Sequence, residues 1–449
     1  MTTEIPTPAT AGAVSSRFDA ASREAVDICR ELIRFDTQNW GNGKANPERP
    51  AAEYIAGLFA EVGLESVIHE AAPGRASLVA RIPGTDPSAG ALVVHGHTDV
   101  VPADASEWSV DPFSGELRDG LVWGRGAVDM KDMDAMIIAA VRQIVREGLR
   151  PRRDLVVAMF SDEENGGTFG ARWMVENHPE LFAGATEAIS EVGGYSADVR
   201  GQRVYLVQTA EKGGVGITLR ATGTAGHGSQ INRDNPVTKL ARAVARIGNH
   251  EWPQRPPLAT LELLRGVADL TGIPFAEENY PVLLDELGSV RKFVGATFVN
   301  TSNPTQLMAG YKQNVIPGTA EAVIDCRTLP GQADELVATL RELCGDDAEV
   351  VVRLNRDALE APMEGRLWDT MVDSLLAEEP TAKVLPYTLS GGTDNKSLAL
   401  LGIEGYGFAP LRLTNDLDFP AMFHGVDERV PASAIEFGTK VLGRFLLEA

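Results

Sequence analysis

The segment ALVVHGHTDVVPAD, residues 91–104, begins as an apolar strand and ends in histidines and aspartates. His95, His97 and Asp99 occupy alternate positions, so they lie on one side of the chain if the strand continues through them. Either a core that tolerates polar side chains or a metal site would explain such a cluster. The rest of the sequence must decide between these two explanations.

Other apolar runs also lead into acids or a histidine. Acidic residues or a histidine stand just before a predicted helix or directly after a short apolar run. They are Asp129, Asp162, Glu163, Glu164, Glu191 and His424. Each feature alone is typical of a solvated turn or of a histidine whose ring nitrogens are hydrogen-bonded within the core. Because five separate segment ends deliver such side chains, we expect them to meet at one edge of one sheet.

This set of side chains suits two divalent cations. Zinc binds imidazole nitrogen and carboxylate oxygen, and catalytic zinc sites leave one position open for water. Two such cations lie about 3.5–4 Å apart in two-metal hydrolases. Asp129 could bridge them, and neighbouring acids that would repel each other become tolerable beside the cations. Glu163 and Glu164 are adjacent, so one can bind a cation while the other moves a proton.

Alternating strands and helices must position these residues. Apolar runs at 77–82, 91–96 and 154–161 alternate with helical patterns such as residues 132–148, which predicts an α/β sheet with helices on its faces. From about residue 213 the order becomes strand, helix, strand, strand, helix, strand, which suggests a small split βαβ unit. One predicted strand of this unit is residues 295–303.

Length, charge and cysteine content exclude several classes of protein. A chain of 449 residues is too long for one core, and a formal charge of −22 disfavours nucleic acid and anionic membranes as partners. The longest apolar runs are too short to span a bilayer, and the N-terminus does not resemble a signal peptide. Cys29, Cys326 and Cys344 are far apart and odd in number, so we expect buried thiols and a cytoplasmic protein.

Three segments in order, HGHTDVVP, DPFSGELRDGLVWGRGAVDMKDM and SDEENGG, closely resemble the M20 family of metallopeptidases and aminoacylases. The resemblance runs from about Ile33 to Leu447. It implies an α/β/α catalytic domain with a mixed, largely parallel sheet and an inserted ferredoxin-like (βαββαβ) lid or dimerisation domain. The expected boundaries are a disordered tail at 1–15, a catalytic domain at 16–211 and 356–449, and a lid domain at 212–355 with a helical insertion at about 251–292.

The same resemblance implies two Zn²⁺ ions, for which Co²⁺ or Mn²⁺ can substitute. The implied metal ligands are His97, Asp129, Glu164, Glu191 and His424, with Asp129 shared by both metals. Glu163 is implied as the general base that takes a proton from a water bridging the metals, and Asp99 as the acid that orients His97. His95 is not a ligand in this pattern. The peptide bond after Asp129 is often cis in the family, so we expect a cis Asp129–Met130 bond.

Motifs in the second half of the chain are implied to bind substrate. His227 of GTAGHGSQ matches a histidine that stabilises the oxyanion and, in dimeric members, reaches the neighbouring subunit's site. Asn314 and Arg327 match residues that hold the substrate's free carboxylate, which suits the planar guanidinium group. The loop of Gly391, Gly392 and Thr393 would approach the same carboxylate with its backbone.

The sequence departs from the family pattern at three places, all outside the implied ligand set. GHGSQI lacks the proline that many members carry shortly after the histidine, Val192 stands where glycine is common, and Asp132 replaces a frequent glycine. The first departure leaves the shape of the substrate pocket open.

We therefore expect a homodimeric hydrolase that cleaves the amide bond of an N-acyl amino acid or a short peptide. Glu191, rather than Asp, favours a deacylase, whereas the long insertion resembles carboxypeptidase-like members, so both alternatives stay open. A protein that binds metal or peptide without turnover is the alternative from another class. Glu163 argues against it, because a binder has no use for a second, unligated glutamate beside Glu164.

Overall fold

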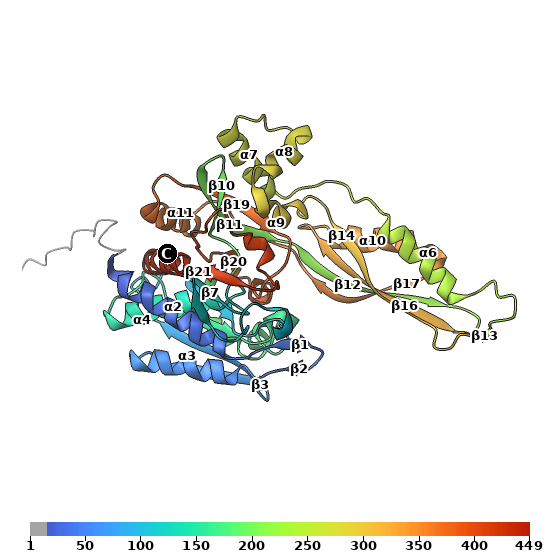
Figure 1. The fold of residues 1–449 in the computed structure, drawn as a ribbon, viewed down its shortest axis with the longest axis horizontal. Coiled ribbons are helices and arrows are strands. Elements are labelled where there is room, and N and C mark those ends of the chain that lie inside the picture. The colour runs from blue at the N-terminus through green and yellow to red at the C-terminus, as the bar shows by residue number, and fades with distance from the viewer. Residues whose placement is uncertain (1–15) are drawn as a thin grey trace, which may run out of the picture.

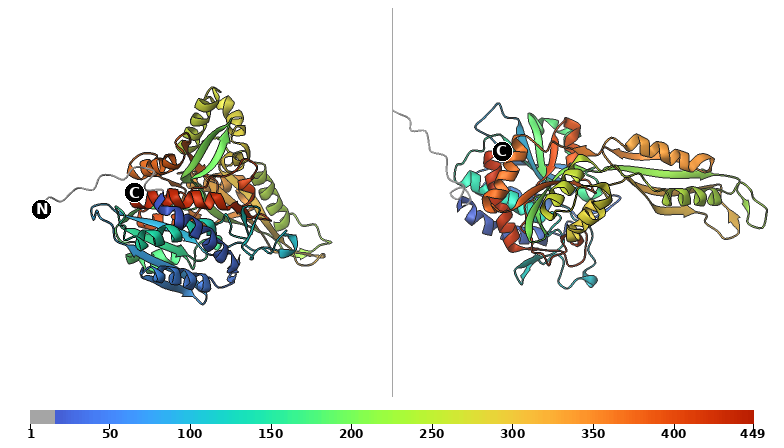
Figure 2. Two further views of the ribbon diagram at one scale, coloured as in Figure 1. Left: turned by 60° about the vertical axis from the view of Figure 1, so that its left-hand side comes forward. Right: turned by 90° about the horizontal axis from the view of Figure 1, so that it is seen from above.

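The computed structural model describes residues 16–449. The tail predicted to be disordered, residues 1–15, lies outside the described residues. The described chain forms a large body around a ten-stranded sheet and a narrow arm that projects from it (Figure 1). The view from above shows the arm extending well beyond the body on one side (Figure 2).

The large sheet is mixed and partly parallel. Its main path runs β10 (Tyr195–Val199), β11 (Gln202–Glu211), β20 (Glu404–Gly407), β9 (Ala185–Ser190), β5 (Ala91–His97), β8 (Leu155–Phe160), β4 (Arg75–Ile82) and β3 (Ser66–Ala72). Two further strands, β18 (Leu359–Glu360) and β19 (Lys383–Leu389), pair with β11. Strands β8, β5, β9 and β20 are parallel neighbours, whereas β3, β4 and β10 pair in antiparallel fashion. The predicted α/β fold class is confirmed.

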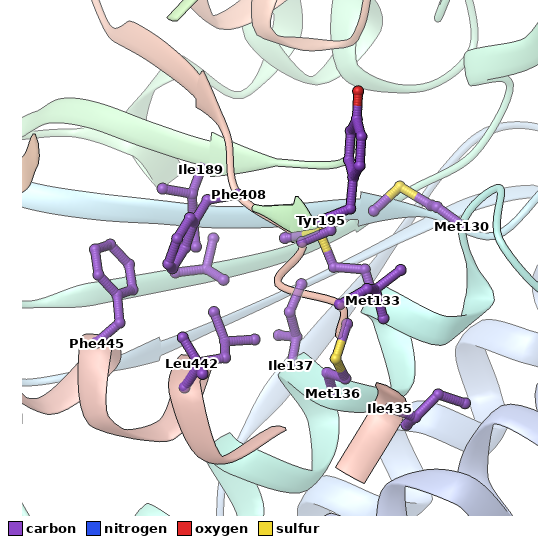
Figure 3. Close-up of a cluster of buried hydrophobic side chains, with 14 of the residues drawn as sticks. Met130, Met133, Met136, Ile137, Ile189, Tyr195, Phe408, Ile435, Leu442 and Phe445 are labelled. Atoms are coloured by element: carbon purple, nitrogen blue, oxygen red, sulfur yellow. The ribbon is translucent and has the colours of Figure 1, made fainter. Parts of the chain in front are cut away.

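Helices cover both faces of this sheet, so its central strands are apolar on both sides. Alternate residues of β5 enter different cores: Leu92 and Val94 join one, and Ala91 and Val93 join the other. The first core contains α2 (Asp19–Arg34), α3 (Arg49–Glu61), α4 (Lys131–Arg146), α11 (Arg366–Glu378) and α13 (Ala432–Glu448). The second contains α5 (Ala171–Asn177) and α12 (Asn395–Leu398). In Figure 3, Ile137 of α4 lies beside Leu442 of α13, and Met136 lies nearer to Ile435 of the same helix.

The arm contains a four-stranded antiparallel sheet with two helices on one face. The strand order is β14 (Thr301–Ala309), β16 (Thr319–Thr328), β12 (Gly213–Thr222) and β17 (Glu349–Arg356), and the helices are α6 (Pro236–Gly248) and α10 (Ala333–Cys344). The expected order of strands and helices is present. The strand predicted at 295–303 is wrong in its first half, because Phe298 packs into the core of the large body and β14 begins only at Thr301.

The helical insertion extends the large body, whereas we expected it in the smaller domain. Its helices are α7 (Leu258–Thr271), α8 (Tyr280–Asp285) and α9 (Arg291–Gly295). Helix α7 contacts β10, β11 and β19, and α9 contacts β19. Val267, Leu283 and Val294 are buried in the first core. The insertion therefore forms one packed unit with the sheet that carries the site described below.

The chain enters and leaves the arm at neighbouring points. Lys212 links β11 to β12, and residues 357–358 link β17 to β18. Gly214 of β12 lies opposite Arg356 of β17 in the register of the small sheet. All three cysteines are buried and unpaired, as predicted. In the part of the chain that the structure describes, we find no helix with the length and apolarity needed to cross a membrane.

Candidate active site

Six of the predicted site residues meet at one edge of the large sheet. They are His97 at the end of β5, Glu163 and Glu164 in the short turn η3 (Glu163–Asn165) after β8, Glu191 directly after β9, Asp129 just before α4, and His424 in the loop after η9 (Phe419–Ala421). Strands β5, β8 and β9 are parallel neighbours, so their carboxyl ends meet at this edge. The topology therefore gathers residues that are far apart in the sequence.

Asp129 stands between two groups of predicted ligands. Its Oδ1 lies 3.2 Å from His97 Nε2, and its Oδ2 lies 3.1 Å from His424 Nε2. Glu191 Oε2 is 3.6 Å from His97 Nε2, and Glu164 Oε2 is 3.2 Å from His424 Nε2. One oxygen of Asp129 thus faces each group, which is the arrangement that a bridging carboxylate needs.

Glu163 lies beside the first group. One carboxylate oxygen of Glu163 and ligand atoms of His97 and Glu191 all lie within 4.8 Å of one another. A second set with the same spacing contains His97, Asp129 and Glu164. The two adjacent glutamates therefore point to different parts of the same site, as expected if Glu164 binds a metal and Glu163 transfers a proton.

The burial of these acids works against their ionisation. Burial raises the pKa of Glu191 to about 8. Burial, together with the charge of Glu191, also raises the pKa of Glu163 well above its usual range. In contrast, hydrogen bonds to Asp129 and Glu164 raise the pKa of His424 to about 10. This many mutually repelling acids in one buried place is the electrostatic environment that divalent cations neutralise.

Asp99 fixes more than the histidine that it was expected to orient. Its carboxylate Oδ1 is 3.6 Å from His97 Nδ1, and its backbone carbonyl oxygen is closer to that nitrogen, at 3.0 Å. The backbone N–H groups of Glu163 and Glu164 donate to the Asp99 carboxylate over 3.0 and 3.2 Å. Asp99 therefore connects the end of β5 to the turn that carries both glutamates.

Sequence reasoning missed Asn39, which supports the same turn from the other side. Asn39, in β1 (Asn39–Gly41), donates through its side-chain amide to Asp99 Oδ2 at 2.9 Å and to Asp162 Oδ1 at 3.0 Å. Asp162 also pairs with Arg75 Nη2 at 2.5 Å, and Arg75 Nη1 pairs with Glu48 at 2.9 Å. The one sequence signal for this network was the position of Asp162 directly before the glutamates.

Glu428 was also missed, and it organises the loop that ends at Asp129. Its buried carboxylate accepts backbone hydrogen bonds from Gly126 at 3.0 Å, Val128 at 2.7 Å and Asp129 at 3.2 Å. Arg125 Nη1 lies 2.7 Å from the same carboxylate. The predicted cis peptide bond between Asp129 and Met130 is confirmed. Glu428 follows His424 by four residues, so its only sequence signal was its place in the HGVDER segment.

A cavity of about 710 Å³ opens beside these acids. It is lined by the predicted loop residues Gly391, Gly392 and Thr393 and by three cationic side chains, Arg327, Arg356 and Lys396. The guanidinium group of Arg327 is paired with Asp325 over 2.8 and 3.1 Å. Lys396 pairs with the buried Glu211 at 3.0 Å, and Arg356 donates to the backbone carbonyl oxygen of Gly166.

The structure does not bring two predicted residues into this cavity. His227 and Asn314 lie at the far end of the arm, where β13 (Gly226–His227) pairs with β15 (Val315–Ile316) (Figure 1). Both side chains are exposed, and the backbone N–H of Gly228 donates to the carbonyl oxygen of Asn314 at 2.9 Å. His95, which was not expected to be a ligand, is buried with its Nε2 2.9 Å from Asn395 Oδ1.

Comparison with known proteins identifies the family. Residues 93–448 match peptidase family M20/M25/M40. The chain belongs to this family. It is therefore a hydrolase of the M20 type, and the predicted resemblance is confirmed.

Relatives in M20/M25/M40 cover nearly the whole chain. An N-fatty-acyl-amino acid synthase/hydrolase from Xenopus tropicalis is 28% identical over 92% of this chain and 83% of its own length. Human aminoacylase-1 is 26% identical over 96% of this chain and 97% of its own. An M20 metallo-carboxypeptidase from Sulfolobus solfataricus has the same fold, with a TM-score of 0.71 at 16% identity over 95% of this chain and 99% of its own. The dipeptidase Dug1p from Saccharomyces cerevisiae also has a TM-score of 0.71, at 13% identity over 98% of each chain.

Proposed function

We propose that this M20 hydrolase cleaves the amide bond of an N-acyl amino acid that carries a free carboxylate, with two divalent cations bound at the sheet edge. The observation that carries the proposal is the placement of Asp129 between His97 and His424, with Glu163 beside the site and outside that bridge. The relatives named as aminoacylase and as N-fatty-acyl-amino acid synthase/hydrolase support deacylation over peptide cleavage.

The donor set fits such cations. Two imidazoles and three carboxylates supply nitrogen and oxygen ligands, the set that zinc accepts, and Co²⁺ or Mn²⁺ can use the same ligands. Zinc is the identity that we propose. The buried Glu191, with a pKa raised to about 8, needs a positive partner to stay ionised at neutral pH. When bound, the cations would polarise the scissile carbonyl group and make water easier to deprotonate.

The protein's own groups would move the proton and hold the turn. Glu163 is the proposed general base: its carboxylate accepts a proton from the attacking water and then passes it to the nitrogen of the leaving amine. Burial raises the pKa of Glu163 well above its usual range, so this carboxylate accepts a proton more readily than an exposed glutamate, which suits it to the exchange. Asp99 keeps Glu163 in place through the backbone hydrogen bond of 3.0 Å.

The free carboxylate of the substrate would bind among the cationic side chains of the cavity. Arg327, the residue implied by the family resemblance, lies there together with Arg356 and Lys396. Asp325 pairs with Nε and Nη2 of Arg327, so a substrate carboxylate would bind the remaining N–H groups of that guanidinium group or displace Asp325. The backbone of Gly391 and Gly392 lines the same cavity, in agreement with the role proposed for this loop.

We further propose that the arm acts as a lid and that a second copy of the chain supplies His227 and Asn314. Both residues lie at the arm's far end and do not line the cavity of their own chain. A homodimer formed through the arm would let each copy donate these residues to its neighbour. We keep the domain boundaries proposed from the sequence, with the helical insertion reassigned to the large body because it packs into that core. The cytoplasm is the proposed location, supported by three unpaired cysteines.

A substrate panel tests the function. The protein is loaded with Zn²⁺, or with Co²⁺ or Mn²⁺, and release of free amine is measured for N-acyl amino acids, their carboxamide analogues and dipeptides. We expect N-acyl amino acids to be cleaved fastest and the carboxamide analogues to lose at least about tenfold in kcat/KM, because a charge-assisted contact is lost. Faster cleavage of dipeptides would assign the protein to the peptidases, and no cleavage by the metal-loaded protein would overturn the proposal.

A further inference from the structure

Four aromatic rings form a closed cluster at one side of the catalytic cavity. Ring centroids are 6.3 Å apart for Tyr195 and Phe293, 5.3 Å for Phe293 and Phe423, 5.2 Å for Phe423 and Phe419, and 5.0 Å for Phe419 and Tyr195. Three of these four pairs are edge-to-face or nearly so, and all lie within the range of favourable aromatic contacts. We call these four residues the aromatic cluster.

The cluster has a buried half and a half that faces the cavity. Tyr195 and Phe419 are 1% and 4% exposed, and they anchor the cluster in the first core. Phe293 and Phe423 are half-buried, and both line the cavity that contains Glu163 and Glu191. Their free surface is therefore apolar surface that a ligand in this cavity could cover.

The cluster adjoins the predicted metal ligands. Phe423 directly precedes His424, and Val192, which also lines the cavity, directly follows Glu191. Val192 has a φ of 57°, a left-handed conformation that is costly for a β-branched residue and free for glycine. A residue held in such a conformation at a site points to a functional use of its side chain. Here the valine adds apolar surface beside the cluster that glycine would lack.

Phe293 comes from the helical insertion. It lies on α9, whose neighbouring residue Val294 is fully buried in the first core. Helix α9 contacts β19 of the large sheet, so the insertion is fixed to the same body as the predicted metal ligands. The insertion thus supplies an aromatic side chain to a cavity whose acids come from the strand ends.

We infer that the aromatic cluster, with Val192, binds a large apolar acyl group and that Phe293 determines this specificity. The inference rests on the proposed function and names its substrate class: amino acids that carry a long-chain or aromatic N-acyl group. In such a substrate the carboxylate and the amino-acid side chain branch from the same carbon. The amino-acid side chain therefore stays near the cationic residues that bind the carboxylate. The acyl chain leaves the planar trans amide in the opposite direction and has no charge to desolvate.

The test compares two acyl groups on one amino acid. N-octanoyl-methionine and N-acetyl-methionine are offered to the zinc-loaded wild-type protein and to Phe293→Ala, and kcat and KM are measured. We expect the wild type to favour the octanoyl substrate by at least about tenfold in kcat/KM, because each methylene buried in an apolar pocket adds to transition-state binding. Phe293→Ala should bring this ratio to within about threefold of unity, because the loss in kcat/KM is larger for the octanoyl than for the acetyl substrate.

Phe275→Ala is the matched control. Phe275 belongs to the same insertion and packs against Tyr280, and it does not line the cavity. This variant should keep the wild-type preference for octanoyl. A second comparison keeps the acetyl group and measures kcat/KM for N-acetyl-alanine and N-acetyl-phenylalanine. Phe293→Ala should not change the ratio of these two values.

Two results would overturn the inference. One is an equal kcat/KM of the wild type for both acyl substrates. The other is a decrease in kcat/KM of Phe293→Ala that depends on the amino-acid side chain of the substrate and not on its acyl group. Calorimetric binding of the same two ligands to zinc-loaded Glu163→Gln separates this outcome from failure of the proposed function. If no amide is cleaved at all, the proposed function fails. The aromatic cluster would still be supported as an acyl site if Glu163→Gln binds the octanoyl ligand more tightly than the acetyl ligand and the double variant with Phe293→Ala does not. Equal binding of the two ligands would reject it.

Discussion

The backbone N–H of Glu163 donates a hydrogen bond to the carboxylate of Asp99 over 3.0 Å. Asp99 follows the end of β5, and Glu163 begins the turn after β8, so this bond joins two neighbouring strand ends of the sheet. The same carboxylate accepts the backbone N–H of Glu164 at 3.2 Å. One buried acid therefore sets the positions of the proposed base and of a proposed ligand together.

Glu163→Gln should remove catalysis and leave metal binding intact. Glutamine keeps the shape of the side chain and cannot take up a proton, so we expect kcat to fall by about 10²–10⁴-fold. Metal content, measured by elemental analysis, should stay at the wild-type value, because Glu163 lies outside the five proposed ligands. Substantial remaining activity would contradict the role of Glu163 as the general base.

Asn39→Ala should lower kcat although Asn39 does not line the cavity. The change leaves Asp99 and Asp162 without their shared donor, which costs about 1–3 kcal/mol in a buried network and loosens the turn that carries Glu163. We expect kcat to fall about tenfold with KM within about twofold. Asn46→Ala, in the same segment, is the control, and equal losses in both variants would show a general effect on folding.

Removal of divalent cations should abolish activity and lower thermal stability. Dialysis against a strong chelator leaves the buried acids without a neutralising charge, so we expect the melting temperature to fall by roughly 2–5 °C. Added Zn²⁺, Co²⁺ or Mn²⁺ should restore both activity and melting temperature. Undiminished hydrolysis by a sample shown to be metal-free would defeat the two-cation proposal.

A mixture of two inactive variants should regain activity if His227 acts across a dimer. His227→Ala and Glu163→Gln chains are coexpressed, so that half of the dimers pair one of each. One site of each mixed dimer then has an intact Glu163 and receives His227 from the partner, which gives about one quarter of wild-type activity. Mixtures without any gain over the separate variants would place His227 outside the partner's site.

Lys212 should make stability depend on pH between about 8 and 10.5. Burial, aided by the charge of Arg327, lowers the pKa of Lys212 from 10.5 to about 8, while its Nζ donates to the carbonyl oxygens of Ala296 and Val299 at 2.9 and 2.8 Å. Between these two pKa values the unfolded chain binds the proton and the folded chain does not, so stability rises with pH across this window. Below pH 8 both states are protonated and the cost of burying the charge is fully present.

The contribution of Lys212 can be isolated with Lys212→Met. Urea denaturation of both proteins from pH 7 to 10.5 should show a wild-type free energy of unfolding that rises by about 3 kcal/mol more than that of the variant. Parallel curves for the two proteins would mean that Lys212 keeps its ordinary pKa in the folded chain.

The sequence allowed prediction of those site residues that follow apolar runs. A strand followed by histidine or glutamate can be recognised locally, and parallel pairing then brings the strand ends together, as for His97 and Glu191. The pairing of Arg327 with Asp325 was also accessible, since residues two apart on a strand share a face. It was missed because the family resemblance assigned that guanidinium group to the substrate.

Other features depend on contacts that no local pattern records. Asn39 meets Asp162 across 123 positions of sequence, and neither the short strand around Asn39 nor its composition indicates that partner. The helical insertion was recognised as helical, but amphipathic helices do not specify which of two sheets they cover. The distance of His227 from the cavity follows from the length of the arm, which only the three-dimensional arrangement shows (Figure 1).

Because Gly214 faces Arg356 in the small sheet, the two ends of the arm leave the large body side by side. A short loop joining Lys212 to Asp357 would therefore excise the whole arm without separating β11 from β18 and β19. The insertion helices would need their own link to β19, since they belong to the body that remains. The arm is in this sense an exchangeable module, and chimaeras that carry the arm of another family member could combine a different arm with the same large body.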